Sequence, residues 1–215
     1  MKNITLKHLL FFAFFAVLYL SACNQHDSNN NKAVKKAASS PKAKAKSPFT
    51  QVNTWIDDFK NFRTAVYQQD VANMKTYFNF PVVADTTQIW ETIYESVEES
   101  KRPQTNPATF TEADFEKHYK QLFNIAFLQS LLKVKSEQLY QTGEYTTPSI
   151  KKGDQSFYML ARYDKATASL QLSVMFSGWK DENGDEMSEG ESAVIYFFKV
   201  ADNKYLKFDK ILFAG

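Results

Sequence analysis

The sequence predicts an α+β fold in which N-terminal helices pack on a curved antiparallel sheet. Three observations support this prediction. Within residues 54–131, apolar side chains recur every three or four positions, the period of a helix with one buried face. From residue 155 onward, apolar and polar side chains alternate, the period of a half-buried strand. Turn-forming residues separate these alternating stretches, which is typical of hairpin-linked strands that cover a layer of helices.

The first helix is expected over residues 54–69. Asp57 and Asp58 fall between its apolar positions and are expected to face solvent. Asp70 is suited to cap a short second helix that reaches about residue 77. The apolar stripe of the first helix is Trp55, Phe59, Phe62 and Val66.

Two more helical regions are expected before the sheet. Residues 85–99 carry Ile89, Ile93 and Val97 at a spacing of four. A loop with two prolines follows, and Thr111-Glu-Ala-Asp114 then resembles the capping box of a helix whose stripe continues to residue 131. An early strand is expected near residues 135–145.

The sheet itself is expected from four alternating segments. In one of them, Leu170, Leu172 and Val174 project to one side, whereas Gln171 and Ser173 project to the other. Polar turns lie between the segments. The four predicted strands are residues 155–164, 168–179, 191–200 and 204–213.

Residues 1–22 have the pattern of a secretory signal peptide, with two early lysines and then about a dozen apolar residues. The segment ends in Leu20-Ser21-Ala22-Cys23, which resembles the lipobox of bacterial lipoproteins. That resemblance implies acylation of Cys23, the single cysteine of the 215-residue chain. Asn24 is similar to the residue that follows the cysteine in lipoproteins sorted to the outer membrane. A lipid-anchored protein on the periplasmic side of the outer membrane is therefore expected. The alternatives are an uncleaved membrane anchor and a secreted protein with an incidental cysteine.

Residues 23–48 are expected to form a disordered basic tether, because Asn, Ser, Ala, Lys and Pro dominate them. The tether carries six lysines and one aspartate, whereas residues 49–215 carry 18 basic and 23 acidic residues. A basic run can bind nucleic acid, but the export signal argues against such a partner. Contact with anionic lipid and a simple soluble spacer both stay open.

Residues 49–215 form one predicted domain with a recognisable order of elements. A first helix, QQD (68–70), a short helix, YFNFP (77–81), a third helical region and the ending SAVIYFFKVADNKYLKFDKILFAG resemble the nuclear transport factor 2-like superfamily. This resemblance implies a cone of helices and sheet, as in ketosteroid isomerases and SnoaL-type proteins. The superfamily contains enzymes, transport factors and binding proteins, and its members often dimerise through the sheet. Function must come from the site.

The domain lacks the residue sets of the commoner catalytic and metal sites. His118 is its single histidine and it has no cysteine, so no zinc site and no cofactor are expected. Asp181-Glu-Asn-Gly-Asp-Glu186 resembles part of a calcium loop, but its glycine is misplaced and Ser192 stands where the closing glutamate belongs. A hairpin tip is expected there instead. There is no G-x-S-x-G elbow and no phosphate-binding glycine loop.

The expected function is non-catalytic binding of a small apolar ligand or an envelope protein. A cavity between residues 54–69, residues 85–99 and the concave face of the sheet is the expected site. By resemblance to ketosteroid isomerase, an isomerase or hydratase with a carboxylate base and a tyrosine is the enzymatic alternative. An accessory subunit of an envelope complex is the other alternative. Candidate ligand-binding side chains are Trp55, Phe59, Trp90, Tyr94, Tyr158 and Arg162.

Overall fold

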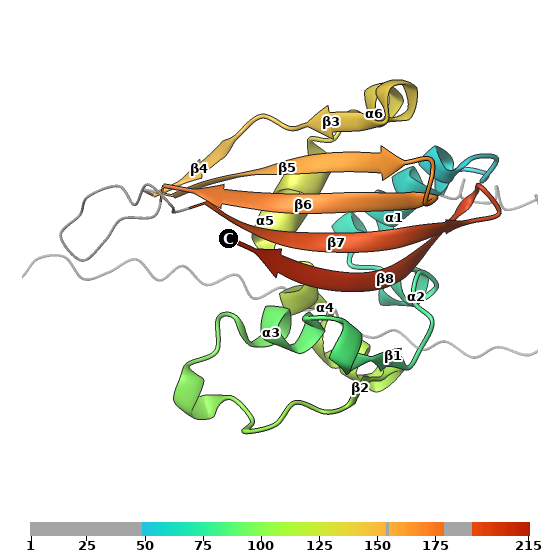
Figure 1. Ribbon diagram of the computed structural model, residues 1–215. Helices are drawn as coiled ribbons and strands as arrows, with labels where there is room; N and C mark the ends of the chain where they lie inside the picture. The colour runs from blue at the N-terminus through green and yellow to red at the C-terminus, as the bar shows by residue number, and fades with distance from the viewer. Residues whose placement is uncertain (1–48, 154, 179–190) are drawn as a thin grey trace, which may run out of the picture. The chain divides into compact units, whose positions relative to one another are not determined.

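The computed structural model describes residues 49–153, 155–178 and 191–215. These residues belong to one compact unit, Ala45–Gly215. The signal segment, Cys23, the tether and the acidic loop at 181–186 lie outside the described residues. In the described ranges the fold is α+β, with helices against a curved, open antiparallel sheet (Figure 1).

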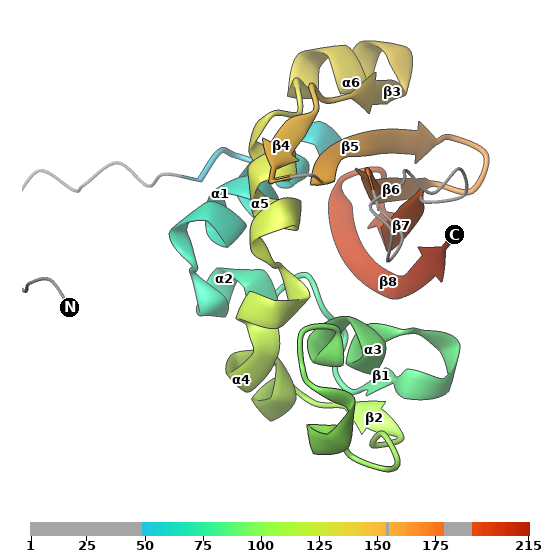
Figure 2. The same cartoon turned by 90° about the vertical axis from the view of Figure 1, so that its left-hand side faces the viewer.

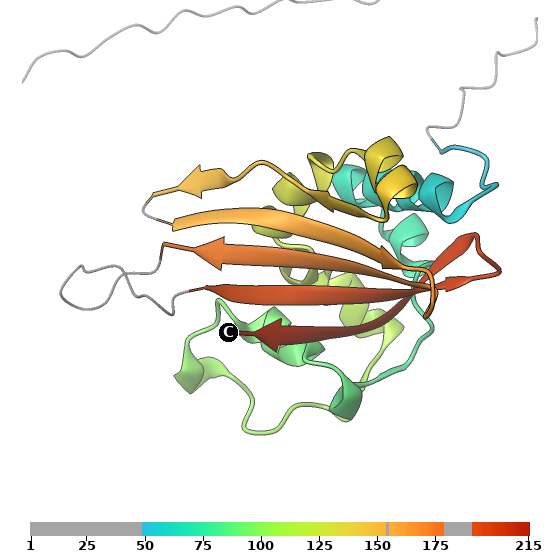
Figure 3. The same cartoon turned by 45° about the horizontal axis from the view of Figure 1, so that its top comes forward.

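The main sheet forms where the alternating pattern predicts it. In the described residues it has six strands in the order β3-β5-β6-β7-β8, with β4 also paired to β5. Figure 3 shows the four long strands side by side. Asp202 and Asn203 turn the chain between β7 and β8 with left-handed φ angles of 52° and 56°, which these residue types tolerate. The strands are β3 (Glu144–Thr146), β4 (Ile150–Lys152), β5 (Gln155–Asp164), β6 (Ser169–Ser177), β7 (Ser192–Ala201) and β8 (Tyr205–Ala214).

The first two helices match their predicted positions. Helix α1, Trp55–Gln68, starts where the Asp57 carboxylate accepts hydrogen bonds from two backbone N–H groups in front of it. It ends at Gln69, which adopts a left-handed φ of 53°. Asp70 then caps helix α2, Val71–Lys75, as expected.

Helix α3, Ile89–Tyr94, is much shorter than the helix predicted over 85–99. A 3-10 turn, Ala84–Thr86, comes before it, and Thr87 is extended. The reason is tertiary. Thr87 and Gln88 form hydrogen bonds with strand β8, and this geometry is incompatible with an earlier helical start. The small ladder of β1 (Val82–Val83) with β2 (Thr109–Phe110) and the 3-10 turn Glu99–Lys101 complete this region.

The segment after Thr111 departs from the prediction in two places. The expected long helix is divided into α4, Glu112–Leu122, and α5, Ile125–Leu132, because Asn124 is extended and caps the second helix. The strand predicted near 135–145 is wrong over most of its length. Helix α6, Ser136–Thr142, occupies it and ends at Gly143, whose φ is 80°. The helices are thus not an N-terminal block but are spread over residues 55–142, with β1 and β2 between them.

The two faces of the sheet differ. Helices α1, α2, α4 and α5 lie on one side of it, as Figure 2 shows, and the side chains of this inner face are buried. The opposite, outer face carries no described helix (Figure 1). Its central side chains are half-buried apolar residues: Tyr158, Leu160, Met175, Ile195, Phe197 and Leu212.

Strand β8 is an edge strand whose free edge is covered by residues from the helical half. The backbone N–H of Leu206 donates to the Asp58 carboxylate at 2.7 Å, and that of Phe208 donates to the carbonyl of Tyr77 at 2.7 Å. The Thr87 hydroxyl accepts from the N–H of Ile211 at 2.8 Å, and the Gln88 side chain accepts from Phe213. This edge therefore has few free backbone groups for pairing with another strand. The residues that cover it are Asp58, Tyr77, Thr87 and Gln88.

Candidate binding site

Phe59 lies in a filled core, whereas Trp55 is buried but also lines a surface pocket of about 480 Å³ together with Tyr140, Tyr163 and Lys165. Phe59 is fully buried, and the Trp55 ring stacks on Tyr163 with a centroid distance of 4.4 Å. Between α1 and the middle of the sheet, aromatic rings contact one another, as in the pair of Phe62 and Phe198 at 5.1 Å. The space in which the sequence places a cavity is thus occupied by side chains at this level of the sheet.

Trp90 and Tyr94 form a separate cluster on α3. Their rings stack at 5.8 Å, and the indole N–H of Trp90 donates to the carbonyl of Pro107 at 3.0 Å. Trp90 also meets Phe110 edge-on at 5.2 Å. These contacts hold α3 against the loop that follows it, and they explain why Trp90 is buried.

Tyr158 and Arg162 lie on the outer face, so the expectation that they share a cavity with the helices is wrong. They alternate along β5 with Phe157 and Met159, which are buried on the inner face. The Arg162 guanidinium pairs with the Glu144 carboxylate at 2.7 Å on the exposed surface. The six side chains proposed from sequence therefore fall into three places and do not converge on one site.

Asp58 is the principal correction among the acidic residues, because it is buried and does not face solvent. Its carboxylate lies 3.3 Å from the hydroxyl of Tyr77 and accepts the N–H of Leu206. Burial raises the pKa of Asp58, and burial next to Asp58 also raises the pKa of Tyr77. An acid that faces a tyrosine is the pairing found in isomerases of the resembled fold, but here both carboxylate oxygens are occupied by contacts that hold β8. The pair has a structural role.

One pocket combines apolar and polar side chains in its lining, and it lies where the inner face of the sheet meets α3. It has a volume of about 560 Å³ and is termed the end pocket. Its apolar wall comes from the ends of three strands, and its polar wall comes from the two residues that flank α3 and from the start of β5. This location overlaps the predicted region between 85–99 and the sheet, although the residues differ. The main lining side chains are Gln88, Glu95, Gln155, Phe176, Val194 and Phe213.

Glu95 is the one carboxylate side chain among the described residues that line the end pocket. One side of this residue meets solvent, but burial of the rest raises the pKa of its carboxyl group. The Gln88 side-chain oxygen is occupied by the N–H of Phe213, which leaves its amide hydrogens for a ligand. The pocket thus offers an apolar wall, one acceptor carboxylate and amide donors.

A catalytic partner for Glu95 is missing from the described lining. Tyr196 lies on the same inner face, and burial, together with the charge of Glu95, raises its pKa. Its hydroxyl is buried, however, and donates to the carbonyl of Leu122 at 2.7 Å. It cannot stabilise an oxyanion in the pocket without breaking that bond. Such an arrangement can hold a ligand, and the Tyr196 hydroxyl is not among the donors that it offers to an oxyanion.

No metal centre forms in the described ranges, since no three histidine, cysteine, aspartate or glutamate side chains gather there. Within the same ranges, no helix has the length and apolar character needed to cross a membrane. Comparisons with protein-family models, with curated proteins and with solved structures find no match to this chain. The end pocket is therefore interpreted from its geometry alone.

Nothing in the sequence pattern singles out Gln88, Gln155 or Phe213 as neighbours. They come from a helix boundary and from two strands that are not adjacent in the sheet. One feature of the sequence does indicate that Phe176 and Phe213 are neighbours. Both lie near the ends of predicted strands, and the ends of antiparallel strands meet at the rim of the sheet.

Proposed function

We propose that this chain is a lipid-anchored bacterial envelope protein whose domain binds a ligand and performs no chemistry on it. In this proposal residues 1–22 are removed, Cys23 is acylated, and the tether places residues 49–215 on the periplasmic side of the outer membrane. The lipobox-like sequence Leu20-Ser21-Ala22-Cys23 supports the anchor. The absence of a second cysteine also fits, since acylation removes the one reactive thiol from an oxidising compartment.

The proposed fold family is the nuclear transport factor 2-like superfamily. Helices on one face of a curved, open sheet and a long closing hairpin, β7 with β8, support it. In such a fold the inner face of the sheet and the helices around it enclose the binding site. The end pocket lies at one end of the inner face, next to α3, and so supports this proposal.

The observation that carries the binding proposal is the end pocket itself, a cavity with an apolar wall and a single described carboxylate. Phe176, Val194 and Phe213 supply contact for the apolar part of a ligand. Glu95 and the amide of Gln88 supply an acceptor and a donor. The ligand class is a small, mostly apolar molecule with a hydroxyl or amide group.

A dye-binding experiment tests this proposal. Residues 23–215, prepared without lipid, are titrated with the neutral hydrophobic dye Nile red. Phe213 is partly exposed in the pocket, so Phe213→Ser is expected to weaken dye binding several-fold while the protein stays folded. The matched control is Leu212→Ser, the neighbouring residue on the outer face. Equal binding by the wild type and Phe213→Ser would contradict the proposal.

The raised pKa of Glu95 favours a second candidate, an isomerase or hydratase that uses this carboxyl as a base. Glu95→Gln separates the two candidates, because it removes the base and keeps the shape of the pocket. Retained dye binding with no turnover of enolisable ketones by the wild type supports a binding protein. Turnover by the wild type that Glu95→Gln abolishes supports the enzyme.

The apolar outer face favours the remaining candidate, an accessory role in an envelope complex. Its half-buried centre includes Leu160, Ile195 and Phe197, and charged residues surround it. In a pull-down from envelope extracts, loss of partners in Leu212→Ser but not in Phe213→Ser would favour this candidate. Concentration-dependent self-association that Leu212→Ser removes would instead indicate a dimer.

A further inference from the structure

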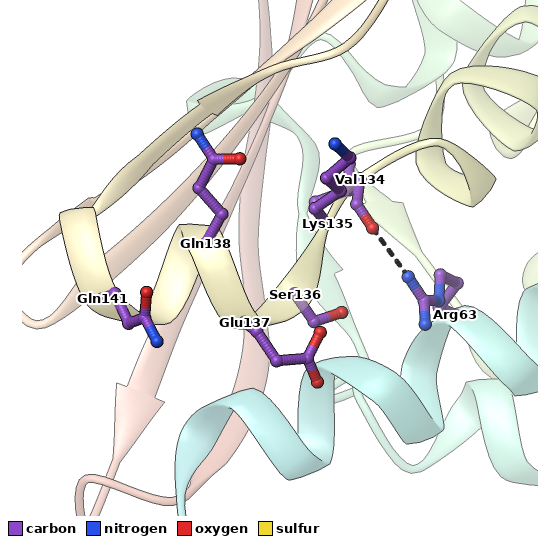
Figure 4. Close-up of a pocket in the computed structure, with 7 residues that line it drawn as sticks. All are labelled: Arg63, Val134, Lys135, Ser136, Glu137, Gln138 and Gln141. Atoms are coloured by element: carbon purple, nitrogen blue, oxygen red, sulfur yellow. Dashed lines mark hydrogen bonds between the residues drawn. The ribbon is translucent and has the colours of Figure 1, made fainter.

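A second pocket lies between helix α1 and the segment that joins α5 to α6 (Figure 4). It has a volume of about 580 Å³ and is termed the polar pocket. Arg63 enters it from α1, and Lys135, Ser136 and Glu137 enter it from the start of α6. Its lining is almost entirely polar or charged, in contrast to the apolar wall of the end pocket.

The charges of the polar pocket leave a positive surplus. The Arg63 guanidinium donates to the carbonyl of Val134 at 2.8 Å and pairs with none of the described acids. Glu137 is paired with Lys60 at 2.9 Å on the exposed rim. Contact with Lys60 and, to a smaller degree, the charge of Arg63 lower the pKa of Glu137. The lining therefore has two cations, Arg63 and Lys135, against one acid that is shared with Lys60, in a domain that carries more acidic than basic residues overall.

Ser136 is a second and independent indication of a ligand. Its side chain is 2% exposed, and its hydroxyl has no hydrogen-bond partner among the described residues. Figure 4 shows this hydroxyl directed to the side of the pocket where Arg63 lies. A buried hydroxyl without a partner is costly, so an acceptor atom in the pocket would stabilise it.

We propose that the polar pocket binds a small oxyanion, a phosphate or carboxylate group, through Arg63, Lys135 and the Ser136 hydroxyl. A guanidinium that has used one N–H on a carbonyl keeps further donors in a plane that matches two oxygens of such a group. The ammonium of Lys135 adds charge at the rim. The hydroxyl hydrogen of Ser136 rotates and donates to the same group.

For Glu137 the proposal predicts the opposite effect on anion binding from that of the basic residues. Its carboxylate lies at the pocket beside the proposed anion and repels it, although Lys60 screens part of that charge. Replacing Glu137 by glutamine is therefore expected to strengthen anion binding. Replacing Lys135 by glutamine, which changes an exposed side chain, is expected to weaken it.

Calorimetric titration tests the proposal on the full chain, purified from membranes in a maltoside detergent that contains no phosphate. Inorganic phosphate and acetate are titrated separately at constant ionic strength. We expect saturable binding of at least one. We expect a loss of about tenfold in Lys135→Gln, and of tenfold or more in Arg63→Gln, because hydrogen bonds to charged groups contribute about 1.5–3 kcal/mol. Ser136→Ala should lose several-fold, and Glu137→Gln should gain.

The matched control is Arg102→Gln. Arg102 also donates to backbone carbonyls, those of Val97 and Glu95, and it has no described acidic partner, but it lies outside the polar pocket. Saturation by neither anion, or an equal loss in Arg102→Gln, overturns the proposal. If Arg63→Gln lowers the melting temperature sharply, its loss of binding could come from unfolding. The anion affinity of Lys135→Gln, which changes an exposed side chain, then tests the proposal. Phosphate binding alone identifies a phosphoryl ligand, and acetate binding alone identifies a carboxylate ligand.

Discussion

Asp58 shows how a single residue can be misassigned from a helical pattern. It follows Trp55 by three positions and precedes Phe62 by four, so it belongs to the buried stripe by spacing. Its charge, taken alone, suggests that the side chain faces solvent. The structure resolves the conflict, because the N–H of Leu206 needs an acceptor at this point of the β8 edge. A polar residue at a stripe position is therefore a signal of a buried hydrogen bond.

Asp58→Ala is expected to destabilise the protein by about 1–3 kcal/mol, because it leaves a buried backbone donor without a partner. Thermal or urea unfolding measures this change. The control is Asp85→Ala, since Asp85 is exposed and contacts no described partner. An effect of Asp58→Ala no larger than that of the control would show that water replaces the carboxylate at the edge.

Glu95 predicts a pH dependence of dye binding. Burial raises its pKa above the ordinary value of 4.5, so the neutral form persists to higher pH than usual. A neutral apolar ligand meets a less polar wall when Glu95 is protonated. Nile red affinity is expected to be highest below that ordinary value and to fall as pH rises through the raised pKa.

In Glu95→Gln the dye affinity should stay constant over the same pH range. Circular dichroism at each pH checks that both proteins remain folded. A parallel pH dependence in the two proteins would assign the effect to another group.

The elements that the sequence predicts well are those with several repeats of one period. Helix α1 and the four long strands are of this kind. The early start of the 85–99 helix fails because β8 takes the polar groups of Thr87 and Gln88. The strand predicted at 135–145 fails because Gly143 ends a helix there. Contacts distant in sequence decide the first case, whereas a glycine next to the helix decides the second.

Helix α1 makes a quantitative prediction for its buried stripe. Phe59→Ala should destabilise the domain by about 3–5 kcal/mol, as other large-to-small changes in a filled core do. Tyr67→Ala on the same helix should be nearly silent, because Tyr67 is 61% exposed. Denaturant unfolding of both variants gives the comparison. A small loss in Phe59→Ala, with stronger dye binding, would indicate a core that tolerates a cavity.

At the scale of the whole molecule, the proposed lipoprotein consists of a basic tether followed by an acidic domain. The two have opposite charge, with six lysines in residues 24–48 and an excess of acidic residues in 49–215. Near an anionic membrane, this distribution of charge would attract the tether to the surface and repel the domain from it. A pocket that captures ligands would then stay exposed to the surrounding fluid.

Cys23→Ser is expected to release the protein from the membrane fraction or to leave it unprocessed, because it removes the thiol that the proposed acylation requires. Fractionation of cells and intact mass measurement report the result. The variant should appear in the soluble fraction or as a precursor that keeps residues 1–22. A variant that pellets with membranes at the mass of the processed wild type would contradict the lipoprotein proposal.

The covered edge of β8 has a consequence for how the chain reaches its native state. The bond from Leu206 to Asp58 spans 148 residues, and that from Ile211 to Thr87 spans 124. Contacts of such long range form late in folding. A chain in which these bonds have not yet formed exposes the free edge of β8, because β8 pairs with β7 through a short hairpin of its own. An open edge of this kind is a template for pairing with another strand, so docking of the helical residues on β8 protects the folding chain from aggregation.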